Sequence, residues 1–280
     1  MKGSVVALLG GLGNQLFQVA FARWLERRTE YEVRYDISFR RDLELDVCDL
    51  PEIGPEVRDR VLSRTRRWPT PSGRLPVIGR GLRRAWGPRR IVIDYTSAGP
   101  AYPSYREPAW WFGYWQRLRY AQDLVTTLRD ALSINDSMGT DRPVGVHVRR
   151  RDMLTTTSSL PGDWFRSALR RLPSDITGRV CVWSDDPQWC ESELDLGVPF
   201  DVAPGASAVE HLTALAGCRA LVISRSTFSW WAAAIAASHG ARIVFPTPWW
   251  PGSPKLEHAV VPGSWTPVPQ DSGDRAADRD

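Results

Sequence analysis

Polar residues that could hold an anion lie in the run Gly-Val-His-Val-Arg-Arg-Arg-Asp over residues 145–152. Alternation places His147 and Arg149 on one face of a predicted strand. Buried basic groups are costly unless an anion or a carboxylate satisfies them. The Arg149 guanidinium presents a planar fork of donors suited to phosphate, and Asp152 is placed to hold one guanidinium. The alternative is a solvated basic strand end with a buried histidine. All but two of the 36 basic residues are arginine, so a run of arginines is weaker evidence for a binding site than usual.

A second polar segment, Trp-Ser-Asp-Asp-Pro over 183–187, follows another predicted strand. Asp186 before Pro187 is typical of a helix N-cap with proline at the first helical position. Asp185 is then left to accept hydrogen bonds from a ligand, such as the N–H edge of a guanine. A purely structural role for both aspartates is the alternative.

A third segment, Ser-Arg-Ser-Thr-Phe-Ser over 224–229, is rich in hydroxyl groups. A turn from a strand into a helix presents backbone N–H groups and the positive end of the helix, which together bind phosphate well. A serine or threonine N-cap on a buried, alanine-rich helix is the structural interpretation. Both interpretations can hold at once.

A fourth segment, Gly-Gly-Leu-Gly-Asn-Gln over 10–15, lies near the N-terminus. It is similar to the dinucleotide-binding pattern, but the third glycine would fall on Leu16, and Asp36 is the acid nearest the expected distance. A nicotinamide-dependent enzyme therefore stays an alternative. The glycine turn could instead place the amides of Asn14 and Gln15 at the mouth of a cleft.

The elements that must position these segments form two α/β halves. Strands are predicted over 4–9, 32–36, 144–149, 179–183, 220–224 and, last, 241–245, and helices over 15–28, 120–132, 164–172, 187–194, 209–217 and 227–238. Such alternation predicts parallel sheets with both faces covered, and ligands then bind at the carboxyl ends of the strands. We expect domains over 1–135 and 136–269, with a polar, disordered tail over 270–280.

Composition excludes several classes of protein. The chain has 280 residues, of which 42% are hydrophobic and 24% charged, as in ordinary soluble proteins. No apolar stretch reaches the roughly 18 residues of a membrane span, and the first residues lack the features of a signal peptide, so a cytoplasmic protein is expected. The four cysteines show no metal-binding spacing, so reduced thiols are expected. The fourteen tryptophans could fill the core or stack on sugars.

Charge points away from nucleic acid, since the net charge is only +4. Eleven arginines and one acid lie between Arg58 and Arg90, a segment interpreted as loops and short helices on a basic surface. This surface could contact an anionic membrane or a lipid-linked acceptor, or it could simply be a solvated face.

Five motifs together resemble the α-1,2-fucosyltransferases of glycosyltransferase family 11. They are Gly-Gly-Leu-Gly-Asn-Gln-Leu-Phe-Gln at 10–18, Gly-Tyr-Trp-Gln at 113–116, His-Val-Arg-Arg-x-Asp at 147–152, Ser-Asp-Asp at 184–186 and Ser-Thr-Phe-Ser-Trp-Trp at 226–231. The resemblance implies the GT-B fold, with two Rossmann-like domains whose parallel sheets face each other across a cleft. It also implies inverting transfer of L-fucose from GDP-fucose to a hydroxyl of a glycan, typically O-2 of a galactoside.

The same resemblance assigns roles by position. Arg149 would grip the β-phosphate with Arg150 beside it, and His147 and Asp185 would lie near the guanine and ribose. The pyrophosphate turn would be Ser226, Thr227 and Phe228, Asn14 would face the transferred sugar, and Gly11, Gly13 and Asp152 would complete the donor site. Arg149 and Asn14 are the residues expected to be catalytic.

No metal or other cofactor is expected, because an arginine clamp can replace the metal that other sugar-nucleotide enzymes hold with Asp-x-Asp. The one such motif here is at 278–280, in the tail. Three residues depart from the family pattern, namely Arg151 where glycine is usual, Met153 where an aromatic is common, and Arg225 where asparagine is usual. A different nucleotide sugar, a small-molecule acceptor or a non-catalytic glycan-binding protein therefore stay open as alternatives.

Overall fold

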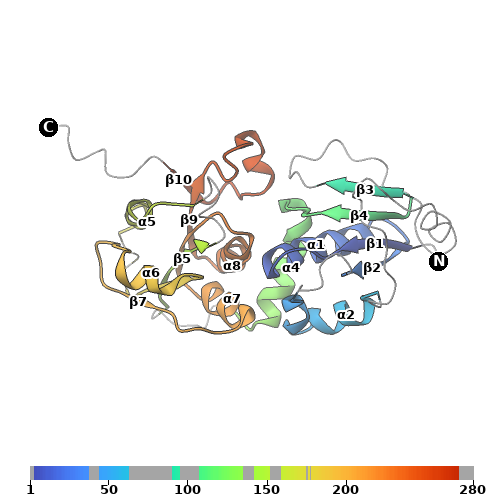
Figure 1. Ribbon diagram of the computed structural model, residues 1–280, viewed down its shortest axis with the longest axis horizontal. Coiled ribbons are helices and arrows are strands. Elements are labelled where there is room, and N and C mark those ends of the chain that lie inside the picture. The colour runs from blue at the N-terminus through green and yellow to red at the C-terminus, as the bar shows by residue number, and fades with distance from the viewer. Residues whose placement is uncertain are drawn as a thin grey trace. The chain divides into compact units, whose positions relative to one another are not determined.

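The computed structural model describes residues 3–37, 44–62, 90–94, 107–134, 142–151, 159–174, 176 and 178–270 (Figure 1). The chain divides into two compact units, Met1–Leu124 and Val125–Asp280, and the division falls inside helix α4 (Leu118–Ala131). Among the residues described, no helix combines the length and the apolar character needed to span a bilayer.

The first unit is built on a parallel sheet with strand order β2-β1-β4-β3. Its elements are β1 (Gly3–Ala7), α1 (Leu12–Glu26), β2 (Glu32–Asp36), the 3-10 helix η1 (Asp46–Asp49), α2 (Ile53–Arg60), β3 (Arg90–Asp94) and β4 (Ala109–Gly113). Strand β1 is buried because its neighbours β2 and β4 lie on both sides of it.

Tryptophans fill the core of this unit. Trp110, Trp111 and Trp115 are each at most 2% exposed. Phe21 of α1 stacks on Trp115 with ring centroids 4.2 Å apart and meets the edge of Trp111 at 5.4 Å. On the opposite face, Trp110 packs with Val5 in a smaller cluster. The choice left open by the sequence is therefore decided for these three residues, which are core side chains.

The second unit contains a parallel six-stranded sheet with strand order β10-β9-β8-β5-β6-β7. Its elements are β5 (Val144–Val148), α5 (Gly162–Leu169), β6 (Val180–Ser184), α6 (Pro187–Ser192), β7 (Phe200–Val202), α7 (Ala208–Ala216), β8 (Ala220–Ile223), α8 (Thr227–Ala237), β9 (Arg242–Thr247), the 3-10 helix η3 (Pro254–Ala259) and β10 (Thr266–Pro269).

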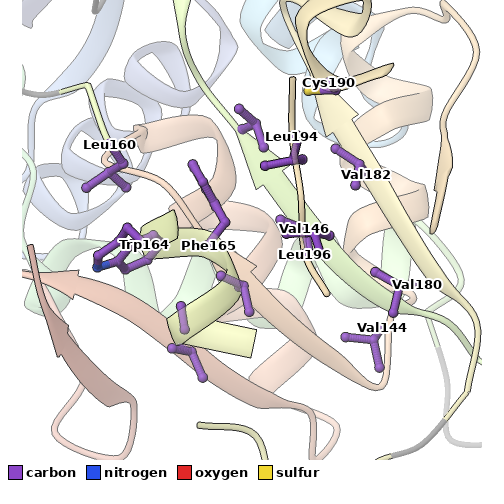
Figure 2. Packing of buried hydrophobic residues seen from close by; sticks show 14 of the residues in the cluster. Val144, Val146, Leu160, Trp164, Phe165, Val180, Val182, Cys190, Leu194 and Leu196 are labelled. Carbon is purple, nitrogen blue, oxygen red and sulfur yellow. The ribbon is translucent and has the colours of Figure 1, made fainter. Parts of the chain in front are cut away.

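Both faces of strand β5 are buried, as the sequence predicted for a parallel sheet. Val144 and Val146 point into a cluster with Trp164 and Phe165 of α5 (Figure 2). Val148 belongs to the same cluster. On the other face, a Cβ built on Gly145 would lie 2.5 Å from Leu221 Cδ2 and 2.8 Å from Cys218 Sγ. This close approach explains why a glycine stands in the middle of the strand.

The predicted class, α/β with parallel sheets, is confirmed, but the predicted strands did not include β3, β4, β7 or β10. The expectation that the strand over 241–245 is the last is wrong, because β10 pairs in parallel with β9. Strand β10 has the sequence Thr-Pro-Val-Pro. It was not predicted because two prolines in four residues argue against a strand. The prolines are tolerated because β10 lies at an edge of the sheet.

Parts of the basic segment and of the termini fall outside the described residues. Of the stretch from Arg58 to Arg90, the structure describes only the end of α2, residues 61–62 and the first residue of β3. The Arg60 guanidinium there donates to both carboxylate oxygens of Glu26, at 2.8 and 2.9 Å, so it is not a solvated cation. The tail over 271–280 also lies outside the described residues. All four cysteines are free thiols and buried.

Candidate functional site

Three polar segments meet at the carboxyl edge of the second sheet. Strands β8, β5 and β6 are neighbours in that order, and all run parallel. The residues that follow them, 149–151, 185–186 and 224–226, are therefore brought to one edge although they are far apart in the chain. Ligands bind at such edges in open parallel sheets.

Asp185 organises the loop after β5. One oxygen of its carboxylate accepts from the backbone N–H of Arg150 at 2.8 Å, and the other accepts from that of Arg151 at 3.2 Å. The second oxygen also lies 3.3 Å from Arg149 Nε. The expectation that Asp185 is left for a ligand is wrong to that extent, because the carboxylate already shapes the loop. The carboxylate still has lone pairs that could accept from a ligand. The predicted ligand contact of Asp185 therefore stays a prediction.

The Arg149 side chain is 37% exposed, and Asp185 orients it at Nε. A guanidinium anchored at Nε can present its terminal nitrogens as a fork toward an anion. The phosphate-binding role of Arg149 stays a prediction.

Arg150 is held differently from Arg149. Its Nε lies 3.3 Å from Asp186 Oδ2, and its guanidinium lies over the Trp189 ring at 4.1 Å from the centroid. Asp186 does occupy the N-cap position before Pro187, as predicted, but its side chain makes no capping hydrogen bond. The carboxylate instead faces Arg150, so Arg150 and Asp186 form an ion pair next to Arg149 in the sequence.

Ser224 links the ends of β5 and β8. Its hydroxyl oxygen lies 3.1 Å from His147 Nδ1 and accepts from the backbone N–H of Arg149, also at 3.1 Å. A serine hydroxyl can donate one hydrogen bond and accept two, so it can pair with Nδ1 of His147 in either ring tautomer. Ser224 was not singled out from the sequence, although its position just after a strand that neighbours β5 was a usable signal.

His147 is a buried, neutral histidine. Its side chain is 6% exposed, and its ring centroid lies 5.6 Å from that of Phe228 in α8. Burial, together with the charges of Arg149 and His211, lowers the pKa of His147 to about 3. It supplies shape and a fixed hydrogen bond at neutral pH rather than charge.

Helix α8 begins at this edge with an open N-terminus. Ser226 occupies the N-cap position, as the structural interpretation predicted, but its side chain makes no capping hydrogen bond. The first backbone N–H groups of a helix have no partner within the helix. The N–H groups around Thr227 and Phe228 therefore remain suited to an anion.

Arg225, in the same turn, is buried at 6% exposure. Its Nε donates to the carbonyl oxygen of Pro248 at 3.0 Å. Burial lowers its pKa, and the charge of Glu257 opposes that shift. The turn thus carries a cation beside the positive end of α8.

The glycine turn of the first unit is built from amides that bind backbone. Gln15 Nε2 donates to the carbonyls of Gly10 and Glu44 at 2.9 and 2.7 Å, while its Oε1 accepts from the N–H of Val47 at 3.1 Å. Gln15 is fully buried, so its amide serves this turn rather than a cleft mouth. The φ of 72° at Gly10 requires glycine there.

Asn14 differs from Gln15, because its side chain is only partly buried and pairs with another side chain. Its Oδ1 accepts from Gln116 Nε2 at 3.0 Å. Gln116 comes from the Gly-Tyr-Trp-Gln motif and was not proposed as a site residue from the sequence. Gly11 is exposed at the N-cap of α1, and Gly13 is buried in its first turn.

The site residues predicted from the sequence thus fall into two groups. His147, Arg149, Arg150, Asp185, Ser226, Thr227 and Phe228 gather at the carboxyl edge of the second sheet, whereas Gly11, Gly13 and Asn14 belong to the turn after β1 in the first unit. Asp152 and Met153 lie outside the described residues. Within the described part of the chain, no group of three or more histidine, cysteine, aspartate or glutamate side chains is arranged to hold a metal ion.

The fold and this edge define an α/β protein with two parallel-sheet units and a cationic turn in the second. Residues 98–266 match the model of glycosyl transferase family 11, well over half of the chain. The chain belongs to this family and is a glycosyltransferase.

Two relatives from Escherichia coli are named as sugar transferases. An alpha-1,2-colitosyltransferase is 22% identical over 291 residues, covering 94% of this chain and 98% of that protein. The O-antigen biosynthesis glycosyltransferase WbnK is 28% identical over 132 residues, covering 43% of this chain and 42% of that protein.

Among solved structures, the fucosyltransferase NodZ from Bradyrhizobium superposes with a TM-score of 0.50. It is 17% identical, and the match covers 83% of this chain and 92% of that one. At this identity the likeness concerns the fold, and it agrees with the GT-B class expected from the motifs.

Proposed function

We propose that this glycosyltransferase transfers L-fucose from GDP-fucose, with inversion, to O-2 of a galactoside in a glycan. The observation that carries the proposal is the carboxyl edge of the second sheet, where Arg149 lies beside the open N-terminus of α8. Both features attract the diphosphate of a nucleotide sugar.

The chemistry follows from where charge develops during transfer. As the glycosidic bond breaks, positive charge builds on the sugar and negative charge on the departing diphosphate. A guanidinium held in place by Asp185 and the N–H groups of α8 stabilise that negative charge more strongly in the transition state than in the ground state. Because these groups can neutralise the leaving diphosphate, we also propose that activity needs no metal ion.

A second candidate keeps the reaction and changes the sugar. The relative that covers 94% of this chain is named for colitose, not fucose. Arg225, which departs from the family pattern, is a further reason to consider another donor. Transfer from nucleotide-activated colitose is therefore the competing proposal.

Calorimetric titration of GDP, UDP and GDP-fucose into wild type and Arg149→Ala, in EDTA throughout, tests the donor site. Binding of the guanine nucleotides alone, weakened at least tenfold in the variant, is the expected result. Preference for UDP would overturn the donor proposal.

Turnover is then measured with the fucose and colitose donors, each with and without EDTA, on galactoside acceptors. Faster transfer of fucose supports the first proposal, and faster transfer of colitose supports the second. Complete loss of turnover in EDTA would refute metal independence.

A further inference from the structure

Arg225 carries hydrogen-bonding capacity that the folded chain does not use. Its side chain is 6% exposed, and Nε is anchored on the Pro248 carbonyl at 3.0 Å. Nη1 and Nη2 are also buried, and neither has a hydrogen-bond partner in the part of the chain that the structure describes. Buried donors of this kind are costly when unpaired, so the arrangement is one that a bound acceptor would complete.

Glu257, the acid whose charge acts on Arg225, does not accept a hydrogen bond from Nη1 or Nη2. Glu257 influences Arg225 electrostatically, but its two oxygens accept from Thr247 Oγ1 at 3.0 and 2.9 Å. One of them also accepts from the backbone N–H of Trp249 at 2.6 Å. Among the described residues, no ion pair within 4.0 Å joins Glu257 to Arg225. Glu257 therefore acts on Arg225 through its charge and leaves Nη1 and Nη2 without a hydrogen-bond acceptor in the described ranges.

Strand order places the two arginines on opposite sides of β8. Arg149 follows β5 and donates its backbone N–H to Ser224, whereas Arg225 contacts Pro248 just after β9. Neighbouring strands are about 4.8 Å apart, so the ends of β5 and β9 are separated by roughly 10 Å. Helix α8 begins from the strand between them. Arg149 is anchored on Asp185 and Arg225 on the Pro248 carbonyl, so a ligand with two linked anionic groups at the α8 turn offers an acceptor to each arginine.

We propose that Arg225 binds the diphosphate of the sugar-nucleotide donor from the β9 side of the α8 turn, opposite Arg149. The inference rests on the proposed function, because that function supplies the diphosphate. Phosphate oxygens can accept from Nη1 and Nη2 together while others accept from the first N–H groups of α8. An asparagine at this position could offer one neutral amide and no charge.

The test compares GDP with guanosine on wild type, Arg225→Asn and Arg225→Lys. GDP is expected to bind roughly 10- to 100-fold more weakly to the asparagine variant, because a charge-assisted contact is lost. Guanosine, measured by competition, should bind both proteins equally, and the lysine variant should fall between. Arg242→Asn is the matched control, since Arg242 is an exposed arginine at the opposite end of the neighbouring strand β9.

A stability measurement separates binding from a structural role. Arg225→Met removes a buried charge that has no partner at Nη1 or Nη2, and it also removes the hydrogen bond to the Pro248 carbonyl. These two effects on stability are opposite, so the melting temperature without ligand should change little. The increase in melting temperature caused by GDP should shrink. A structural role predicts the reverse, a lower melting temperature with the GDP effect intact.

The outcomes distinguish this inference from the proposed function. If wild type binds GDP and Arg225→Asn binds it equally well, or if guanosine binding falls as much as GDP binding, Arg225 does not contact the diphosphate. If wild type binds neither GDP nor UDP, the donor site itself is refuted and the role of Arg225 falls with it.

Discussion

The turn after β1 and the turns after β5 and β8 occupy corresponding places in their sheets, at the carboxyl ends of parallel strands, but their polar side chains are satisfied differently. In the first unit, the amides of Gln15 and Gln18 bind backbone groups, and both residues are fully buried. In the second unit, the cations at the edge are oriented by carboxylates or by a single carbonyl.

This difference indicates that the second unit, and not the first, has side chains suited to an anionic ligand. Neutral amides that bind backbone shape a turn and leave no net charge behind. The guanidinium groups of Arg149 and Arg225, anchored at Nε, keep their positive charge at the edge of the sheet. Substitutions at the two edges should therefore have separable effects. We expect those in the second unit to change donor binding and turnover, and those in the first unit to change stability or sugar transfer.

The largest expected effect is on turnover, from Arg149→Ala. Loss of a cation at the leaving diphosphate should lower kcat for fucosyl transfer by about 1000-fold. The melting temperature should change little, because this side chain is 37% exposed. Steady-state kinetics with GDP-fucose measure the loss, and Arg242→Ala is the control. A fall in kcat below about tenfold would show that the charged edge does not act on the chemical step.

Gln15→Leu should have the next largest effect, and on stability alone. The change leaves the N–H of Val47 and the carbonyls of Gly10 and Glu44 without their partner. The free energy of unfolding should fall by about 2–4 kcal/mol, with KM for GDP-fucose unchanged. Urea denaturation measures this, with the exposed Gln188→Leu as the control. A raised KM with normal stability would place the donor against the first turn.

Asn14→Ala separates sugar transfer from donor binding. The family resemblance implies that Asn14 faces the transferred sugar, and Gln116 holds its amide in place. If that role is correct, loss of the amide should lower kcat about tenfold while GDP affinity stays within about twofold. Gln116→Ala should cause a similar but smaller fall, because it releases Asn14 without removing it. Titration of GDP and steady-state rates on the same preparations provide both values. Equal losses of GDP affinity and kcat would contradict the division between the two units.

A separate expected effect, on stability alone, is the pH dependence that His147 contributes. Its pKa is lowered to about 3 in the folded protein from 6.5. The unfolded chain therefore binds a proton that the folded protein excludes between these values, so stability falls as pH drops below 6.5 and is unaffected above it. The slope is at most about 1.4 kcal/mol per pH unit.

Comparison of wild type with His147→Gln, by urea denaturation at pH 7, 6 and 5, measures this contribution. Glutamine can retain a hydrogen bond to Ser224 and does not titrate. The variant should lose less stability than wild type on acidification. Parallel curves would mean that His147 is not the buried neutral group described above.

The sequence by itself determined the element pattern around the site. Apolar runs and helical periodicity located β5, β6, β8 and α8 to within a few residues, because burial on both faces of a parallel sheet leaves a continuous apolar signature. The motifs at the ends of these strands then marked the edge where a ligand is expected to bind. Pro187 after Asp186 also located the start of α6, since proline is favoured at the first helical position.

Only the tertiary structure decided which polar groups are already engaged. Ser224 and His147 are 77 residues apart and meet because β8 lies beside β5, an order that local pattern does not encode. The same reason applies to Asp185, which binds the loop after β5, and to Arg225, whose burial depends on packing near β9. Residue type and spacing show what a side chain is able to bind, whereas the strand order of the sheet determines which partner it meets.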